Sequence, residues 1–229
     1  MRQLSILIPS KTARNFLTCA EAVRRHEPEV PILLVNDGIP DVEALLRPEL
    51  MPCRSVPGVK PFSFARNVNI GIRAAEEDDI LLLNDDALLR TPFGFTLLQK
   101  TAEAYPEWGV IAATTNSVGN PHQLPKGLGL RREPRMVCFV AVLIPRATID
   151  RVGELDERFG APGCYGFEDD DFCLRVRQAG LQIGIHDGCF VDHASLPSSF
   201  RGHPGTPADV ACFDGGRRLF LQKWGAHPL

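Results

Sequence analysis

Leu4-Ser5-Ile6-Leu7-Ile8 is a short apolar run, which predicts a buried β-strand. After the loop Pro9-Ser10-Lys11-Thr12, apolar residues recur at the spacing of an amphipathic helix, at Phe16, Cys19, Ala20 and Val23. A second apolar run covers residues 31–35 and ends in the turn sequence Asn36-Asp37-Gly38. Strand, helix and strand in this order are typical of a βαβ unit. The stretch therefore predicts an α/β fold with a Rossmann-like, mostly parallel central sheet flanked by helices.

The same pattern continues along the chain. We expect strands at residues 80–83, 110–113 and 136–144, with strand pieces at 181–185 and 189–191. We expect helices at residues 64–75, 95–105, 146–152, 169–179 and 216–224, the fourth closed by Gly180. Residues 114–134 are rich in Gly, Pro, Asn and charge, which predicts a functional or mobile loop.

Composition favours one soluble domain. The chain has 229 residues, 44% hydrophobic composition and a net charge of −3, so nothing indicates nucleic acid or an anionic membrane as a partner. Its seven cysteines include no C-x-x-C pair, which favours free thiols in a reducing compartment. No apolar run is long enough for a signal-peptide core or a membrane span. We therefore expect a cytoplasmic protein. Whether it forms a homodimer is left open.

Polar and acidic residues follow the predicted strands at the points where these end. Ser10 follows the first strand, Asp37 the second, and Asp85 and Asp86 the strand at 80–83. In parallel α/β sheets, ligands bind beyond the carboxyl ends of the strands. Two adjacent carboxylates at such an edge are unfavourable unless a cation or hydrogen-bond donors compensate them, and Mg²⁺ or Mn²⁺ prefers such oxygen ligands. Helix capping by Asp85 or Asp86 remains an equal alternative, and a simple turn explains Asp37.

Four consecutive acids, Glu168-Asp169-Asp170-Asp171, open the helix predicted at 169–179. Acids in a first turn complement the helix dipole, so capping explains two of them. At about 100° per residue the four fan around the helix axis, and at least one points toward the sheet. A carboxylate there, beside a bound nucleotide, could act as a general base, although a solvated acidic helix start explains the run equally well.

These motifs together resemble family 2 of the inverting glycosyltransferases, over nearly the whole chain. The segments that are similar are Ser5-Ile6-Leu7-Ile8-Pro9-Ser10, Val35-Asn36-Asp37-Gly38, Ala65-Arg66-Asn67-Val68-Asn69-Ile70-Gly71 and Leu83-Asn84-Asp85-Asp86. The most specific match runs from Val152-Gly153-Glu154-Leu155-Asp156-Glu157-Arg158-Phe159 through Gly166-Phe167-Glu168-Asp169-Asp170-Asp171-Phe172-Cys173-Leu174-Arg175 to Ala179-Gly180. The resemblance implies a single GT-A domain, with residues 1–90 binding the nucleotide sugar and residues 110–229 the acceptor.

The resemblance also implies roles for single residues. It makes Asp169 the base that deprotonates the acceptor hydroxyl, and Glu168 an acceptor contact. It assigns to the nucleotide-sugar site Pro9, Ser10, Asp37, Arg66, Asn84 and Asp85. The first acid of the family's D-x-D metal motif is Asn84 here, so the implied metal ligands are Asp86 and His193. Without the resemblance, a lone histidine such as His193 is more often an ordinary hydrogen-bonded side chain.

The implied reaction transfers a sugar, with inversion, from a UDP-, GDP- or dTDP-sugar to an acceptor hydroxyl with the help of Mn²⁺ or Mg²⁺. Four basic residues could close over the phosphates or simply lie on the surface: Lys126, Arg131, Arg132 and Arg201. A sugar-1-phosphate nucleotidyltransferase is a rival, but the loop after the first strand lacks the glycines that it needs. A catalytically inactive, transferase-like binding protein is the other rival, and it predicts missing acids.

Overall fold

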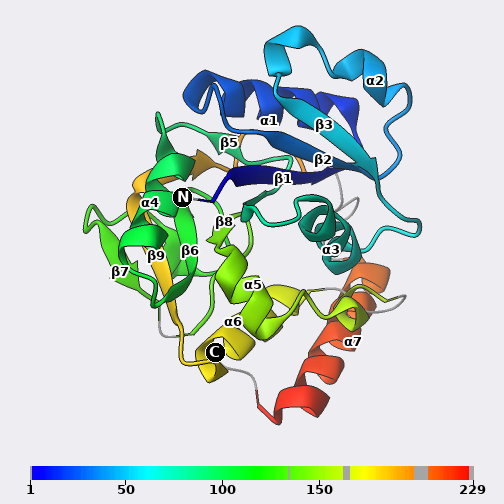
Figure 1. Cartoon of the computed structure of the whole chain (residues 1–229). Helices are drawn as coiled ribbons and strands as arrows, with labels where there is room; N and C mark the ends of the chain where they lie inside the picture. The colour runs from blue at the N-terminus through cyan, green and yellow to red at the C-terminus, as the bar shows by residue number, and fades with distance from the viewer. Residues whose placement is uncertain (1, 134, 162–165, 199–205, 227–229) are drawn as a thin grey trace.

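The structure is a computed structural model that describes residues 2–133, 135–161, 166–198 and 206–226. In this part of the chain, nine strands form one sheet in the order β3-β2-β1-β4-β8-β6-β9-β5, and β7 also pairs with β9 (Figure 1). The strands are β1 (Leu4–Ser10), β2 (Ile32–Asn36), β3 (Cys53–Pro57), β4 (Asp79–Leu83), β5 (Leu88–Leu89), β6 (Trp108–Thr115), β7 (Leu130–Arg132), β8 (Ala141–Ile144) and β9 (Gln182–Asp192).

Most of the sheet is parallel, as the βαβ pattern predicts. The pairs β1–β2, β1–β4, β2–β3 and β6–β9 are parallel, whereas β8 is antiparallel to both β4 and β6. Strands β5 and β7 run antiparallel to β9. The strands β1, β2, β3, β4, β6 and β9 therefore point in one direction, and their carboxyl ends lie along the same edge.

Helices cover both faces of the sheet. They are α1 (Ala13–His26), α2 (Val42–Leu45), α3 (Phe64–Ala74), α4 (Gly94–Ala104), α5 (Arg146–Val152), α6 (Glu168–Gln178) and α7 (Pro207–Trp224), with the 3-10 helices η1 (Pro48–Leu50), η2 (Pro121–Gln123) and η3 (Glu157–Gly160). Because side chains alternate along a strand, Ile6 and Ile8 pack with α1 and α4 on one face, while Leu7 packs with α3, α5 and α6 on the other.

Helix α3 lies unusually close to the sheet. A Cβ added at Gly71 would lie 2.0 Å from Leu7 Cδ1, so only glycine allows this approach. The side chain of Asn69 on the same helix donates to Leu155 O at 2.9 Å and accepts from Leu155 N at 3.0 Å. These contacts fix α3 against the sheet on one side and against the segment before η3 on the other.

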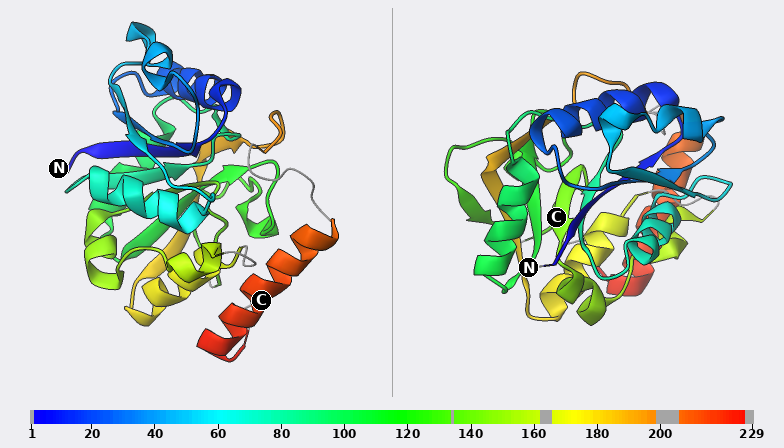
Figure 2. Two further views of the ribbon diagram at one scale, coloured as in Figure 1. Left: turned by 90° about the vertical axis from the view of Figure 1, so that its right-hand side faces the viewer. Right: turned by 45° about the horizontal axis from the view of Figure 1, so that its top comes forward.

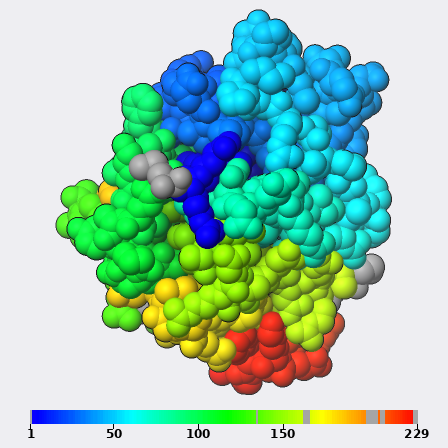
Figure 3. Space-filling view, viewed as in Figure 1, coloured from blue at the N-terminus to red at the C-terminus, as the bar shows by residue number. Residues whose placement is uncertain are grey.

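The last helix, α7, packs on a small apolar cluster outside the sheet layers. Phe159, Phe167 and Phe220 form this cluster. Figure 2 shows α7 as a long helix beside α6, and Figure 3 shows it against the surface that includes η3. Near η3, Lys223 Nζ donates to Asp156 Oδ2 at 2.8 Å. Helix α7 begins at Pro207, earlier than the predicted start at residue 216.

The strand predicted at 136–144 is wrong in its first half, since β8 begins at Ala141. Side-chain amides bind the backbone before that point: Asn120 Nδ2 donates to Met136 O at 2.7 Å, and Gln123 exchanges two hydrogen bonds with Cys138. The two strand pieces predicted at 181–185 and 189–191 are one strand, β9. Its register against β6 shifts between the pairs Ala113–His186 and Thr114–Phe190, a β-bulge that interrupts the apolar pattern.

Across the described residues, no helix combines the length and the apolar character needed to cross a membrane. The six cysteines of this part carry free thiols, and Cys164 lies outside it.

Candidate active site

Polar residues gather at the carboxyl edge of the sheet, where the ends of β1, β2, β4 and β9 meet. Ser10 ends β1, and its hydroxyl donates to Asp85 Oδ2 at 2.5 Å. Both residues are buried. The Ser10 carbonyl accepts from Asp37 N at 2.8 Å. The contacts connect the loop after β4 to β1 and to the turn after β2.

Asp86 lies beside His193, which follows β9. His193 Nε2 lies 3.1 Å from Asp86 Oδ1, and His193 Nδ1 donates to Ser117 O at 2.7 Å. The bond to Ser117 fixes the ring and leaves Nε2 facing the carboxylate. Burial lowers the pKa of His193, but the hydrogen bond to Asp86 and the nearby acidic charges outweigh it, so the net pKa is raised.

Asn116 holds the backbone of His193 in place. Its Oδ1 accepts from His193 N at 2.9 Å, and its Nδ2 donates to Asp192 Oδ1 at 2.9 Å. Asp192 also accepts from Arg90 Nη2 at 2.9 Å. Sequence reasoning missed Asn116 and Ser117, although both follow β6 at the same edge of the sheet.

The Asp86–His193 pair has the chemistry of a small divalent-metal site. Two ligand atoms each about 2.1 Å from one ion, at right angles, are about 3.0 Å apart, close to the 3.1 Å between these two atoms. Within the described residues, no third His, Cys, Asp or Glu side chain completes a metal-binding cluster. The pair therefore fits an ion whose other ligands come from water or from the oxygens of a bound diphosphate.

Asp37 lies in a buried turn after β2. Asn36 Oδ1 accepts from Gly38 N and Ile39 N, and Gly38 has φ +112°, which is the turn that the sequence predicts. The Asp37 side chain is fully buried, and its Oδ2 accepts from Lys60 Nζ at 3.0 Å. Its Oδ1 is buried and has no hydrogen-bond partner among the described residues. Lys60 carries no local signal that marks it as a site residue.

Arg66, predicted to bind the nucleotide sugar, lies on α3 and faces η3. Its Nε lies 3.7 Å from Glu157 Oε2. Pro9 lies in β1, opposite Val35 in the register with β2. The backbone N–H of Asn84 donates to Val140 O at 2.9 Å. Pro9 and Asn84 thus lie at the edge with Ser10, whereas Arg66 approaches it from the helix side.

The four acids that begin α6 separate into two groups. Asp171 is fully buried, and its carboxylate accepts from Arg175 Nε at 2.9 Å and from Trp224 Nε1 at 2.9 Å. Lys223 Nζ lies 2.6 Å from Asp171 Oδ1. Asp171 therefore anchors α7 to α6, and Glu168, Asp169 and Asp170 are left on the other side of the helix start.

The pKa values of those three acids are raised, chiefly by burial. The pKa of Glu168 rises to about 8, because the charges of Asp169 and Asp170 add to burial. The pKa of Asp170 also rises to about 8, because burial and the charges of Asp169 and Asp171 disfavour its charged form. Burial raises the pKa of Asp169 to about 6, while N–H groups of its own turn and of Phe139 favour its charged form. Asp169 is thus the most acidic of the three.

The same three acids line a cavity of about 870 Å³. Its other walls come from the loop at 119–122, from the segment before β8, and from α7. The two parts of the site share one backbone segment: Asp169 accepts from the Phe139 N–H, and the neighbouring Val140 accepts from Asn84 N. The segment at 138–140 therefore couples the position of the α6 acids to that of the loop after β4.

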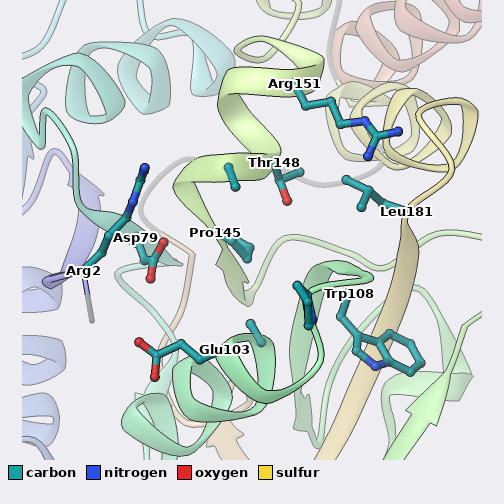
Figure 4. A pocket seen from close by; sticks show the side chains of 11 residues that line it. Arg2, Asp79, Glu103, Trp108, Pro145, Thr148, Arg151 and Leu181 are labelled. Atoms are coloured by element: carbon teal, nitrogen blue, oxygen red, sulfur yellow. The ribbon is translucent and has the colours of Figure 1, made fainter.

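A second cavity, of about 690 Å³, lies at the opposite edge of the sheet. Asp79, which begins β4, and Trp108, which begins β6, line it together with Arg2 and Arg151 (Figure 4). None of the predicted site residues lines it. Its place at the amino ends of the strands separates it from the residues described above.

The basic residues near the loop at 114–134 differ in their surroundings. Arg131 binds Asp187 through two hydrogen bonds of 3.0 Å and also donates to His122 O, so it braces the loop against β9. Lys126 and Arg132 are exposed. Arg201 lies outside the described residues.

Comparison with known proteins gives the fold. No family model matches the sequence, and no curated protein matches it. The crystal structure of GalNAc-T7 with UDP, GalNAc and Mn²⁺ is similar, with a TM-score of 0.70 and 10% sequence identity. The match covers 92% of this chain and 47% of that one, so the chain spans about half the length of the structure it matches. The protein therefore has a GT-A-like fold in a single α/β domain, and the resemblance to family 2 stays a prediction.

Proposed function

We propose that this protein is a metal-dependent glycosyltransferase that moves a sugar from a nucleotide-diphosphate sugar to an acceptor hydroxyl with inversion. The observation that supports this proposal most is the set of polar residues gathered at one edge of the sheet in a GT-A-like fold. This edge holds a carboxylate–imidazole pair at 3.1 Å, and the segment at 138–140 links it to a cluster of acids in an 870 Å³ cavity. The similar structure contains UDP and Mn²⁺. This combination supports both the enzyme class and the ligand class that we propose.

In this proposal the donor lies along the ends of β1, β2 and β4. The buried, unpartnered Oδ1 of Asp37 would accept an N–H of the nucleotide base, with Lys60 holding the other oxygen. Pro9 and Ser10 would border the nucleotide, and Asn84 and Asp85 would contact the ribose or the sugar. Arg66 would reach the phosphates from α3 after leaving its partly exposed ion pair with Glu157, which is a weak contact at 3.7 Å.

Asp86 and His193 would hold the divalent ion, Mn²⁺ or Mg²⁺. When bound, the ion neutralises charge on the diphosphate leaving group. The hydrogen bond from His193 Nδ1 to Ser117 O keeps Nε2 available as a ligand. Asp85 stays bound to Ser10 and contributes to positioning the donor.

Asp169 would act as the general base. Its pKa of about 6 is well matched to taking a proton near neutral pH, whereas Glu168 and Asp170, with pKa values near 8, are partly protonated there. A protonated Glu168 can donate a hydrogen bond to the acceptor as well as accept one. The acceptor hydroxyl would lie in the cavity that these acids line, opposite the donor's leaving group.

Thermal unfolding with nucleotide sugars tests the proposal. A ligand at 100 times its Kd adds about 2.7 kcal/mol to the free energy of unfolding. We expect one of UDP-, GDP- or dTDP-sugars to raise the Tm in the presence of Mn²⁺ and much less in the presence of a chelator. The nucleotide sugar that raises the Tm should also be turned over, with release of its nucleoside diphosphate. If no nucleotide sugar changes the Tm, with or without metal, the proposed function is wrong.

A further inference from the structure

Two arginine side chains line the cavity beside Asp169 without forming an ion pair to any acid in the described part of the chain. Arg135, before β8, and Arg217, on α7, both line this cavity, and neither forms an ion pair with any described residue. Other arginines nearby are paired, for example Arg131 with Asp187 and Arg175 with Asp171. Asp214 on α7 also lines this cavity, so with the three α6 acids its wall holds four acids. Even so, neither arginine is paired with one of them. An unpaired guanidinium that faces a cavity is well suited to binding an oxyanion, because it presents a planar set of N–H donors.

Arg217 is held in position by the anchoring of α7. Lys223 and Trp224, both about two turns further along the helix, bind the buried carboxylate of Asp171. Phe213, one turn before Arg217, packs on Phe167 with ring centroids 4.9 Å apart, yet is 45% exposed at the cavity wall. The wall of α7 thus presents an aromatic face and a cation one turn apart.

We propose that the acceptor is a saccharide that carries a phosphate or carboxylate group, whose oxyanion binds Arg135 and Arg217 while its ring packs on Phe213. This inference rests on the proposed function, since it describes the acceptor of the same site. The hydroxyl that receives the sugar then faces Asp169, and the anion lies toward α7. The arginines offset the repulsion that the α6 acids exert on an anionic acceptor.

Matched acceptors and variants test the inference. Glucose, glucose 6-phosphate and glucuronate serve as acceptor probes with the donor found by thermal unfolding, and hydrolysis of the donor without acceptor is measured in parallel. Arg217→Gln and Arg135→Gln should each raise the KM for the anionic probes about tenfold, the loss expected for a charge-assisted hydrogen bond. The KM for glucose and the rate of donor hydrolysis should change little. Arg218→Gln, the neighbouring exposed arginine that does not line the cavity, is the control.

The outcomes separate the two proposals. If the donor is hydrolysed but glucose is used as well as the anionic probes, or if Arg217→Gln behaves like Arg218→Gln, the anion site is wrong and the transferase stands. If Arg217→Gln instead weakens binding of the nucleoside diphosphate alone, the arginines serve the donor and the inference is also wrong. If calorimetry shows that glucose 6-phosphate binds through Arg217 in a protein that neither binds nor hydrolyses any nucleotide sugar, the anion site stands and the transferase falls.

Discussion

His193 Nε2 and Asp86 Oδ1 lie 3.1 Å apart although 107 positions separate the two residues in the chain. Each residue follows a strand, Asp86 after β4 and His193 after β9, and the carboxyl ends of both strands lie at one edge of the sheet. If the pair holds the metal, Asp86→Ala should lower the affinity for the nucleoside diphosphate at least tenfold in the presence of Mn²⁺ and leave the weak metal-free affinity unchanged. Calorimetry with and without Mn²⁺ measures both values.

The control for the metal pair is a histidine away from the site. His193→Ala should reduce Mn²⁺ binding, followed by electron paramagnetic resonance, whereas His26→Ala, at the end of α1, should not. Equal Mn²⁺ affinity in wild type and both histidine variants would remove the pair from the proposed metal site.

Asp169→Asn should reduce transfer to a small residual rate while donor binding persists. The amide keeps the shape of the side chain but cannot accept a proton, and loss of a general base lowers rates by about 10²–10⁴. Calorimetry with the donor, and turnover with donor and acceptor, separate binding from chemistry. Asp150→Asn, at an exposed acid on α5, is the matched control and should keep wild-type turnover. Wild-type turnover in Asp169→Asn would overturn the assignment of the base.

The pH dependence of transfer should follow Asp169. Burial raises its pKa to about 6, so the carboxyl is protonated and inactive as a base below that value. The apparent kcat/KM should therefore rise with pH through about 6, and the rise should be absent from the residual activity of Asp169→Asn. A profile that is flat between pH 5 and 7 would argue against a base with this pKa.

Glu168→Gln should stabilise the protein at high pH. Burial and the neighbouring acids raise the pKa of Glu168 from 4.5 to about 8, so the folded state keeps a proton that the unfolded state releases. Stability therefore falls as the pH rises from about 4.5 to 8, and the variant removes this loss. Because the side chain is half-buried, we expect a gain on the order of 1 kcal/mol, or about 2–4 °C in Tm, at pH 8.5 and little at pH 4. A Tm difference independent of pH would contradict this origin.

The fold was predictable where the sequence carries continuous apolar runs. Strands β1, β2 and β4 are such runs, and each was predicted to within two residues. Strand β3 was missed because Arg54, Ser55 and Pro57 give an edge strand no apolar pattern, and β5 has only two residues. The start of β8 could not be predicted from the apolar run. Before Ala141, the amide side chains of Asn120 and Gln123 bind the backbone carbonyls that a neighbouring strand would otherwise bind.

The candidate site was predictable only in part, because its residues depend on tertiary contacts to different degrees. Ser10 and Asp85 each follow a predicted parallel strand, and the carboxyl ends of such strands lie at one edge of the sheet. The sequence therefore predicted that the two residues lie at the same edge, and the structure joins them by a hydrogen bond. His193 came from the resemblance, since a lone histidine carries no local signal. Lys60, Asn116 and Arg217 have no signal in the sequence: each acquires its neighbours only when the turn after β2, the end of β6 and the last helix are packed. The roles of all these residues stay predictions.

Trp224→Phe should loosen α7 and weaken acceptor binding without affecting the donor. The indole N–H of Trp224 donates to Asp171 Oδ1, a fully buried carboxylate, and phenylalanine keeps an aromatic ring but removes that donor. Leaving a buried charged acceptor short of one partner costs about 1–3 kcal/mol, which lowers the Tm by about 2–4 °C for each kcal/mol. Hydrogen exchange should accelerate across residues 207–224, and the KM for the acceptor should rise because Phe213 and Arg217 lie on this helix. Trp108→Phe, at the opposite edge of the sheet, is the matched control and should leave exchange in α7 unchanged. Equal exchange of α7 in wild type and Trp224→Phe would mean that the apolar cluster of Phe159, Phe167 and Phe220 holds the helix without the Asp171 contact.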